Sequence, residues 1–282
     1  MAARIEIARH AGVCYGVERA LTMASDAAQD ANGPVSTLGP LSHNPIVVRE
    51  LEQVGVVTAN SVDDCDDGTV IIRAHGVVPQ VVEDAQARGL QVIDATCPYV
   101  KKVHVAAAKL VREGYQLIVV GESGHPEVEG IMGHAGDGAH VVSVPSDLDE
   151  IKLARKVGVV VQTTQTPDAL AAVVTALLPR VGELRVVNTI CAATQERQDS
   201  AAELAARADV MIIVGGKNSG NTRRLAQICA TRCEHSHHIE DASELDASWL
   251  AGAELIGVTA GASTPAAHID RAVDALHALI AG

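Results

Sequence analysis

The amino-acid sequence predicts an α/β protein of three similar lobes, each containing a mostly parallel sheet. Short runs rich in Val and Ile alternate with helix-compatible segments along the whole chain. In addition, three kinds of strand, turn and helix segment each occur three times, in the same order. Strands that alternate with helices are typical of parallel sheets, and such sheets bind ligands beyond the carboxyl ends of their strands. The polar turns at those ends are therefore the candidate functional positions.

The first repeated segment is a β-branched run that leads into a cysteine and then into a helix-compatible stretch. Its cysteines are Cys14, Cys97 and Cys191, and they lie 83 and 94 residues apart. This spacing fits one α/β lobe for each cysteine. We therefore predict three lobes, with the boundaries 1–96, 97–190 and 191–282.

The second repeated segment is a strand, a glycine-containing turn and a polar residue before a helix. The polar residue lies 29, 28 and 28 residues after the cysteine of its repeat. This agreement indicates equivalent positions in the three lobes. The three polar residues are His43, His125 and Ser219.

The third repeated segment is again an apolar strand that ends in a polar turn before a helix. Its polar residues are His75, Thr163 and Ser263. Because the carboxyl ends of parallel strands share one edge of a sheet, these turns belong beside those of the other two segments. If the lobes pack around a pseudo-threefold axis with these edges inward, the three cysteines meet in one central site.

Composition limits the possible function classes. The chain has 282 residues, a formal net charge of −13 and no basic block, which argues against general nucleic-acid binding. Its apolar runs are far shorter than the roughly 18 residues of a membrane span, and its N-terminus lacks an apolar signal core. We therefore expect a cytoplasmic protein without a membrane partner. Because thiols stay reduced in the cytoplasm, metal ligation or redox chemistry is the preferred role for its cysteines.

Three converging thiolates could bind zinc or an iron–sulfur cluster. Such clusters usually have four cysteine ligands, so a cubane held by three leaves one iron open to substrate. The alternative is that the three cysteines are small buried residues at strand ends, because unmodified cysteine is commonly buried. Their matching positions in three repeats favour the metal site.

The other cysteines lack this repeated pattern. Cys65 lies in the acidic loop DDCDDG, which lacks the spacing and the terminal Glu of a calcium-binding EF-hand, so we expect a solvated turn. Cys229, Cys233 and His235 belong to the segment CATRCEHSHH. It resembles a zinc site only weakly, because no second ligand pair follows at finger spacing. From the sequence, metal binding by these three residues stays open.

The polar turns fit an anionic ligand. His43, His75 and His125 could each be an ordinary turn residue, but their equivalent strand ends suggest one shared cavity. Ser219 and Asn221 lie at a helix start, where backbone amides bind anions. The same segment lacks the residues of a P-loop, and no G-x-G-x-x-G follows a strand, so no bound nicotinamide or flavin dinucleotide is indicated.

The segment GHPEVEGIMGH suggests acid–base chemistry. Pro126 at a helix start places His125 just before the first turn and Glu127 within it, near the proposed centre, whereas Glu129 points elsewhere. Burial and negative neighbours would raise the pKa of such a carboxyl and make it a proton donor near neutral pH. The alternative is a first-turn Glu that only complements the helix dipole.

Nine segments of the chain form an ordered set: GVCYGVERA, GPLSHNPIVV, RAHGV, DATCPYVKKVH, GHPEVEG, QTTQT, NTICAATQERQ, GGKNSGNTRRL and TAGASTP. Over essentially the whole chain, they resemble the motifs of the 4-hydroxy-3-methylbut-2-enyl diphosphate reductase family, iron–sulfur enzymes of the non-mevalonate isoprenoid pathway. The resemblance implies a trefoil of three α/β lobes around a central [4Fe–4S] cluster. The implied cluster ligands are Cys14, Cys97 and Cys191.

The resemblance also implies roles for the other site residues. Glu127, helped by Thr163, would deliver protons, and Thr194 would lie near the substrate and cluster. Gly220 stands where some members of the family carry a second serine, so a backbone amide replaces a hydroxyl contact to the diphosphate. The other residues implied to hold the diphosphate are His43, His75, His125, Ser219, Asn221 and Ser263.

The implied reaction is reductive dehydroxylation of 4-hydroxy-3-methylbut-2-enyl diphosphate to isopentenyl and dimethylallyl diphosphate. It uses two electrons and two protons at the open-iron cluster, and the electrons would come from a separate carrier such as ferredoxin or flavodoxin. Two alternatives remain. Quinolinate synthase also has three α/β repeats and a three-cysteine cluster but dehydrates without net reduction, and a non-enzymatic metal or redox protein would need no organised anion pocket.

Overall fold

The computed structural model of the chain describes residues 3–31 and 33–281. The chain divides into two compact units, and each is considered by itself. Unit 1 comprises Met1–Glu18, Ser42–Glu50 and Ala192–Gly282, and unit 2 comprises Arg19–Leu41 and Leu51–Cys191. None of the described helices is long and apolar enough to cross a bilayer.

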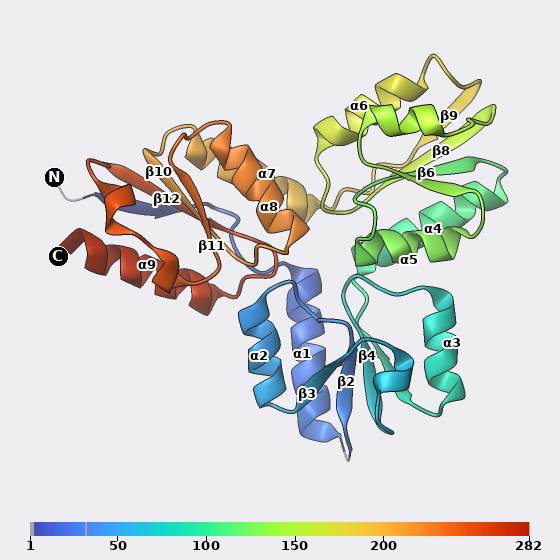
Figure 1. Cartoon of the computed structure of the whole chain (residues 1–282), viewed down its shortest axis with the longest axis horizontal. Coiled ribbons are helices and arrows are strands. Elements are labelled where there is room, and N and C mark those ends of the chain that lie inside the picture. Colours follow the sequence, from blue (N-terminus) through green and yellow to red (C-terminus); the bar gives the residue numbers. More distant parts are fainter. Residues whose placement is uncertain (1–2, 32, 282) are drawn as a thin grey trace. The chain divides into compact units, whose positions relative to one another are not determined.

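The described strands form three parallel four-stranded sheets (Figure 1), which confirms the predicted α/β class. Unit 1 contains the sheet β1-β12-β10-β11, and unit 2 contains the sheets β3-β2-β4-β5 and β7-β6-β8-β9. The strands are β1 (Arg4–Ile7), β2 (Val35–Leu38), β3 (Val56–Ala59), β4 (Thr69–Ile72), β5 (Gln91–Asp94), β6 (Gln116–Val120), β7 (Ala139–Val142), β8 (Lys156–Val161), β9 (Glu183–Val186), β10 (Val210–Val214), β11 (Ser236–Ile239) and β12 (Leu255–Ala260).

The connections between strands contain the helices. Many of them begin with proline, whose fixed φ suits the first helical position and whose missing N–H costs nothing there. The α-helices are α1 (Tyr15–Asp30), α2 (Pro45–Gln53), α3 (Pro79–Ala87), α4 (Pro98–Arg112), α5 (Pro126–Ala135), α6 (Pro167–Leu177), α7 (Ala192–Ala205), α8 (Gly220–Ala230) and α9 (Ala266–Ala281). Short 3-10 helices are η1 (Val62–Asp64), η2 (Pro145–Glu150), η3 (Ala242–Glu244) and η4 (Ala247–Leu250).

In unit 1, helices cover both faces of the sheet. Ile269 and Leu276 of α9 pack on one face, against alternate residues of β10 and β12. Leu204 of α7 and Leu225 of α8 pack on the other face. Because successive side chains of a strand point to opposite faces, the uninterrupted apolar run of β10 serves both cores.

In unit 2, the two sheets are covered in the same way. Alanines of α1 pack on one face of β3-β2-β4-β5, and Ala85 of α3 packs on the other. Helix α6 covers one face of β7-β6-β8-β9, and α4 and α5 cover the opposite face. Every sheet therefore places its polar strand ends at one edge, away from these apolar layers.

Each of Cys14, Cys97 and Cys191 follows the last strand along one edge of a sheet and precedes a helix that packs on a different sheet. Cys97, for example, follows β5 of one sheet and begins α4, which packs on the other sheet of unit 2. The expected lobe boundaries after residues 96 and 190 fall just beyond β5 and β9.

Strand β1 departs from the expected lobe 1–96. It pairs with β12, so Arg4 lies opposite Leu255 in the sheet of the C-terminal residues. The reason lies in the repeat pattern. Strands β5 and β9, which lead to Cys97 and Cys191, each form the edge of the sheet built from the preceding strands. No strand precedes β1, so it takes the equivalent edge position in the sheet of β10, β11 and β12. Strands β3, β7 and β11 were also not predicted, because they lie between the repeated segments.

Candidate active site

A buried carboxyl with hydrogen bonds to one threonine lies in unit 2. Glu127, in the first turn of α5, is 1% exposed. Its Oε1 accepts the backbone N–H of Thr163 at 2.6 Å, and its Oε2 accepts the Thr163 hydroxyl at 2.8 Å. Since α5 follows β6 and Thr163 follows the neighbouring strand β8, both residues lie at the same sheet edge. The structure thus brings these two predicted residues into direct contact.

The environment of Glu127 makes it a usable acid. Burial raises its pKa to about 7, although both hydrogen bonds from Thr163 oppose the shift by favouring the carboxylate. A carboxyl with this pKa populates both protonation states at neutral pH. It can therefore give up a proton and regain it under the same conditions.

Two of the predicted histidines lie beside this carboxyl. His125 is the N-cap of α5, and its Nδ1 accepts the backbone N–H of Glu127 at 3.1 Å. Since an accepting nitrogen carries no proton, the neutral His125 ring has its proton on Nε2 and can donate from there. The ring of His75 meets that of His125 edge-on, with centroids 5.6 Å apart. Unit 2 thus provides imidazole groups next to the acid.

Cys97 and Cys191 are attached to the same turns by backbone hydrogen bonds. The N–H of Cys97 donates to the carbonyl of Ala74, the residue before His75, at 2.9 Å. The N–H of Cys191 donates to the carbonyl of Thr163 at 3.1 Å. A continuous series of contacts therefore joins the two cysteines through His75, His125, Glu127 and Thr163.

His104 lies beside the His75 turn and was not predicted as a site residue. It is 5% exposed and stacks on His134 with centroids 3.9 Å apart. Gly76 has φ +72°, and a Cβ there would lie 2.8 Å from the His104 ring, so glycine is required directly after His75. Burial lowers the pKa of His104 to about 4, with a smaller contribution from His134, so the ring is neutral at physiological pH.

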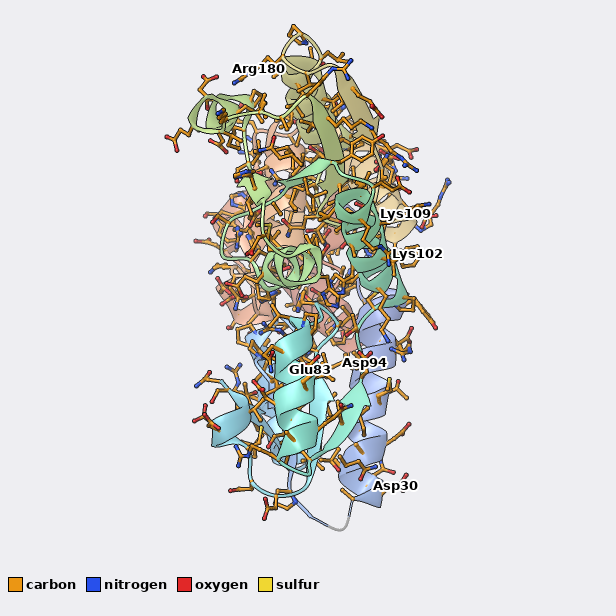
Figure 2. The ribbon with its side chains drawn as sticks, turned by 90° about the vertical axis from the view of Figure 1, so that its right-hand side faces the viewer. Asp30, Glu83, Asp94, Lys102, Lys109 and Arg180 are labelled. Carbon is orange, nitrogen blue, oxygen red and sulfur yellow. The ribbon has the colours of Figure 1, made fainter. Side chains whose placement is uncertain are left out.

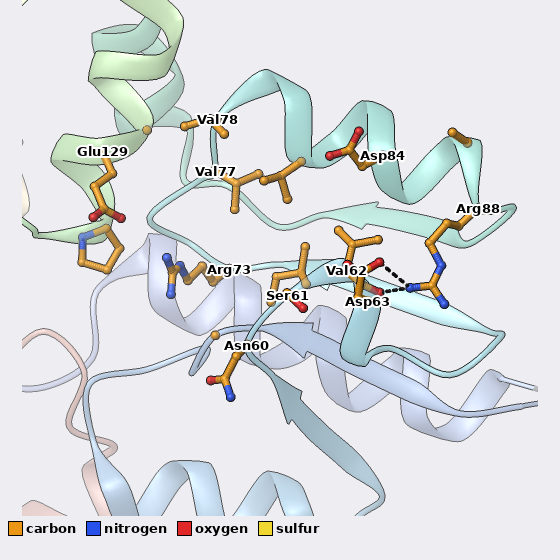
Figure 3. Close-up of a pocket in the computed structure, with 16 residues that line it drawn as sticks. Asn60, Ser61, Val62, Asp63, Arg73, Val77, Val78, Asp84, Arg88 and Glu129 are labelled. Atoms are coloured by element: carbon orange, nitrogen blue, oxygen red, sulfur yellow. Dashed lines mark hydrogen bonds and ion pairs between the residues drawn. The ribbon is translucent and has the colours of Figure 1, made fainter.

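Glu129 lies in surroundings different from those of Glu127, as the helical spacing predicted. It is exposed and lines a cavity of about 570 Å³, together with Arg73 and residues of α3 (Figure 3). Burial lowers the pKa of Arg73, and the nearby carboxylate of Glu129 opposes that effect. Glu127 does not line this cavity. The two glutamates of α5 therefore have distinct surroundings.

In the described part of unit 1, several buried polar groups have no hydrogen-bond partner. Ser219 is the N-cap of α8, and its hydroxyl oxygen accepts the backbone N–H of Thr222 at 3.3 Å, which leaves its proton available for donation. Among the described residues, no group pairs with either side-chain atom of Asn221, which is 5% exposed, or with the hydroxyl of Thr222. Buried polar atoms without partners are costly, so these groups are suited to a polar ligand.

A second turn of unit 1 contains Ser263, and backbone bonds connect it to Cys14. The N–H of Cys14 donates to the carbonyl of Ala262 at 3.0 Å. Ser263 is 7% exposed, and its hydroxyl has no partner among the described residues. Asn44, 2% exposed, donates from Nδ2 to the Ser263 carbonyl at 3.3 Å. Asn44 thereby fixes its neighbour His43 beside the Ser263 turn.

The turn before α8 also approaches His43. A Cβ on Gly216 would lie 2.0 Å from the carbonyl oxygen of His43, so only glycine allows this approach. The backbone N–H of Ser219 in turn donates to the Gly216 carbonyl at 3.0 Å. Unit 1 thus gathers His43, Ser219 and Ser263 through short backbone contacts.

The remaining predicted residues also lie in unit 1. Gly220 is the buried first residue of α8, so its N–H is one of the amides at the helix N-terminus that have no intrahelical acceptor. Thr194 is 3% exposed and lies in the first turn of α7. The N-terminus of α8 adds a favourable dipole for an anion.

Arg197 was missed by the sequence analysis. It is 7% exposed and donates to the carbonyls of Gly12 and Val13, both at 2.9 Å, and of Ala193 at 2.7 Å. These bonds hold the turn immediately before Cys14. The sequence could have shown that an arginine on a buried helix face needs polar partners. Which groups these partners are could be seen only in the folded structure.

The cysteines fall into two classes. Cys14, Cys97 and Cys191 are partly exposed, whereas Cys65, Cys229 and Cys233 are buried, and none of these six described residues forms a disulfide. Partial exposure at strand ends suits ligands of a bound group. The first three cysteines also share the repeated sequence pattern, which the other three lack.

The buried set requires one correction. The aspartates around Cys65 are exposed, but Cys65 itself is 4% exposed and packs in an apolar cluster, so the expectation of a solvated turn is wrong for this side chain. Burial, together with Cys233, raises the pKa of Cys229 to about 12. Within the described part of the chain, Cys229, Cys233 and His235 belong to no group of three close metal-ligand atoms.

Several known proteins resemble this chain over nearly its whole length. A protein from Geobacter sp. (strain M21) named 4-hydroxy-3-methylbut-2-enyl diphosphate reductase is 47% identical over 277 residues, covering 98% of each chain. A protein of the same name from Aquifex aeolicus (strain VF5) is 47% identical over 265 residues, covering 93% of this chain and 91% of the relative.

Two solved structures are also similar. One, described as (E)-4-hydroxy-3-methyl-but-2-enyl diphosphate reductase, the terminal enzyme of the non-mevalonate pathway, has 44% identity and a TM-score of 0.74, with 99% and 100% coverage of the two chains. The other, E-1-hydroxy-2-methyl-but-2-enyl-4-diphosphate reductase from Plasmodium falciparum, has 29% identity and a TM-score of 0.92, with 97% and 88% coverage. The family model described as LytB protein matches residues 5–277. The chain therefore belongs to the LytB protein family.

Proposed function

We propose that the chain reduces 4-hydroxy-3-methylbut-2-enyl diphosphate to isopentenyl and dimethylallyl diphosphate. Relatives that bear this enzyme name cover nearly the full chain at 47% identity, which supports the assignment. The reaction consumes two electrons and two protons, breaks the allylic C–O bond, forms a C–H bond and releases water. The protein must therefore bind a diphosphate, supply protons and receive electrons.

The observation that carries the proposal is the state of Glu127. It is buried, its pKa is raised to about 7, and both its oxygens accept hydrogen bonds from Thr163. Glu127 in its protonated form would give a proton to the substrate, and Thr163 would hold the carboxyl in position. A purely structural first-turn glutamate would gain nothing from such burial.

The diphosphate would be held by donors from several turns. Asn221, Ser263 and Ser219 offer buried donors, and the backbone amides at the start of α8, including that of Gly220, add to them. His43, His75 and His125 would complete the set, and Thr194 would face the rest of the substrate. These groups compensate the net charge of −13, which otherwise disfavours an anion.

We also propose that Cys14, Cys97 and Cys191 hold a [4Fe–4S] cluster. The residues fit this group because all three are partly exposed thiols at strand ends, each fixed by a backbone bond to a turn that carries a predicted site residue. When bound through three cysteines, the cluster supplies electrons and one iron open to the substrate.

The alternatives are less well supported. A quinolinate-synthase-like dehydratase needs no external reductant, and the relatives found here bear a reductase name. A non-enzymatic redox protein does not account for the buried donors of Asn221 and Ser263, which have no partner among the described residues.

A cytoplasmic location stays a prediction.

The test is a reduction assay on the anaerobically reconstituted chain. With reduced methyl viologen as electron donor, we expect 4-hydroxy-3-methylbut-2-enyl diphosphate to be converted to the two isoprenoid diphosphates, with two viologen cations oxidised per product. A chain that contains an intact cluster but oxidises no viologen in the presence of substrate contradicts the proposal.

A further inference from the structure

The three helices that follow the cysteines hold equivalent places in the repeats but differ in charge. Helix α4 contains four basic residues and no acidic one. Helices α1 and α7 each contain one arginine and three acidic residues, for a net charge of −2. In a chain of net charge −13, one of three equivalent helices is therefore selectively basic. The basic residues of α4 are Lys101, Lys102, Lys109 and Arg112.

Much of this charge forms one exposed face. Tyr99, Lys102, Val105, Lys109 and Arg112 follow each other at intervals of three or four residues, which places them on one side of the helix. All are exposed, including the apolar side chain of Val105 at 65%. Figure 2 shows Lys102 and Lys109 along the same helix. We call these five residues the α4 face.

Two charges of the α4 face have no acidic partner among the residues that the structure describes. Lys101, which lies beside the face, forms an ion pair with Asp94 at 2.5 Å, and Lys109 forms one with Glu113 at 3.8 Å. Within the described ranges, no ion pair engages Lys102 or Arg112, and the Nζ of Lys102 lies 5.1 Å from the centre of the Tyr99 ring. Positive charge and an aromatic ring are thus available to a partner.

The α4 face begins at a proposed cluster ligand. Cys97 is the N-cap of α4, and Tyr99 follows it by two residues. At the helical rise per residue, Lys102 lies about 8 Å and Lys109 about 18 Å along the axis from Cys97. A protein bound to the first two turns of α4 would therefore lie close to the cluster.

We propose that the α4 face binds a small acidic one-electron carrier protein. This inference rests on the proposed function, which needs two electrons from outside because the sequence has no motif for a nicotinamide or flavin dinucleotide. Two reduced carriers would each lose one electron, and together with two protons these electrons would break the C–O bond, form the C–H bond and release water. The acidic helices α1 and α7 would repel the same carrier, which directs it to α4.

The test measures binding and turnover separately. The probe is an acidic plant-type [2Fe–2S] ferredoxin, titrated in its oxidised form into the cluster-loaded protein by calorimetry at low and at moderate ionic strength. The variants are Lys102→Glu and Arg112→Glu. The matched control is Lys152→Glu, which makes the same charge change at an exposed lysine before the amino end of β8, away from the cysteine edge.

We expect wild type to bind the ferredoxin with an affinity that falls as salt rises. Lys102→Glu should raise Kd about 3- to 10-fold, Arg112→Glu less, and Lys152→Glu little, because surface charges act mainly on near partners. Turnover with reduced ferredoxin should fall in the same order. Turnover with reduced methyl viologen should not change, because this small donor needs no protein docking site.

Two results would overturn the inference. One is ferredoxin binding by Lys102→Glu that equals wild type, and the other is equal weakening by Lys102→Glu and Lys152→Glu, which would report net charge rather than a face. Absence of turnover with viologen in wild type contradicts the proposed function instead, and the binding titration still gives its own answer.

Discussion

The two units contain different kinds of candidate site residue. In unit 1, the polar side chains of Asn221 and Ser263 are buried and have no hydrogen-bond partner among the described residues. In unit 2, Glu127 and His125 are linked to their neighbours by hydrogen bonds, and one carboxyl has its pKa raised to about 7. Unit 1 thus has buried hydrogen-bond donors suited to a ligand, whereas unit 2 has a carboxyl that can donate a proton near neutral pH.

This difference suggests that residues of unit 1 bind the anion and residues of unit 2 transfer the proton. Neutral donors that no protein group satisfies are suited to an anion, because they bind it without first breaking other bonds. A buried carboxyl held by two hydrogen bonds is suited to proton transfer, because its position is fixed in both protonation states. Substitutions in unit 1 should therefore act mainly on KM, and substitutions in unit 2 mainly on kcat.

The largest expected effect is loss of the proposed [4Fe–4S] cluster. Cys14→Ser in unit 1 and Cys97→Ser in unit 2 should each abolish cluster retention, because a hydroxyl is a poor substitute for a soft thiolate. Cys229→Ser is the control, since Cys229 is fully buried in an apolar cluster. Electron paramagnetic resonance of the reduced proteins measures the outcome, and an unchanged signal in either of the first two variants contradicts the ligand assignment.

The next effect concerns the acid of unit 2. Glu127→Gln keeps the size of the side chain but removes the proton donor, so kcat should fall by roughly 10²–10⁴, the usual range for general acid catalysis. Substrate binding and cluster content should persist. Glu129→Gln is the matched control on the same helix, because Glu129 lines the separate cavity with Arg73. Loss of turnover in the Glu129 variant alone would show that the donor is misassigned.

The raised pKa of Glu127 also predicts how stability depends on pH. Because the folded-state pKa of about 7 exceeds the ordinary 4.5, folding favours the protonated form, and this contribution is complete below pH 4.5 and lost as pH rises through 7. Relative to Glu127→Gln, wild type should lose about 3 kcal/mol in unfolding free energy between pH 4.5 and pH 8. Denaturant unfolding of both proteins at several pH values tests this, and a pH-independent difference contradicts the shift.

The smallest effects concern the donors of unit 1. Ser263→Ala removes one proposed hydrogen bond to the diphosphate, which typically contributes about 1.5–3 kcal/mol for a charged group, so KM should rise about 10- to 100-fold. The same change removes an unpartnered buried hydroxyl, so the ligand-free protein should not lose stability. Steady-state kinetics measure the expected rise in KM, and thermal unfolding measures whether the stability is kept. A loss of stability with an unchanged KM would mean that Ser263 is structural.

Much of the fold was accessible from the sequence because the repeats are long and regular. All nine predicted strands exist, since each is an apolar run bounded by glycine or polar turn residues. Strands β3, β7 and β11 were missed because none of them belongs to a repeated segment. The partner of β1 was also beyond sequence reasoning, because it depends on pairing between the two ends of the chain.

The candidate site was accessible where residues carry recognisable chemistry. Glu127, Thr163 and the cysteines could be selected from their place after strands. Arg197 and Asn44 could not, because their function is to bond backbone carbonyls of distant turns, such as Gly12 and Ser263, and those contacts exist only in the folded chain. The burial of Cys65 was missed for the same reason. Its acidic sequence neighbours indicated an exposed loop, whereas its side chain packs against apolar residues in the folded chain.

The central claim is that Cys14, Cys97 and Cys191 hold an iron–sulfur cluster in a reductase. Anaerobic purification followed by iron, zinc and labile-sulfide analysis tests it most directly. The account predicts about four iron and four sulfide ions per chain, as a [4Fe–4S] cluster requires. One zinc ion per chain, without labile sulfide, would contradict it.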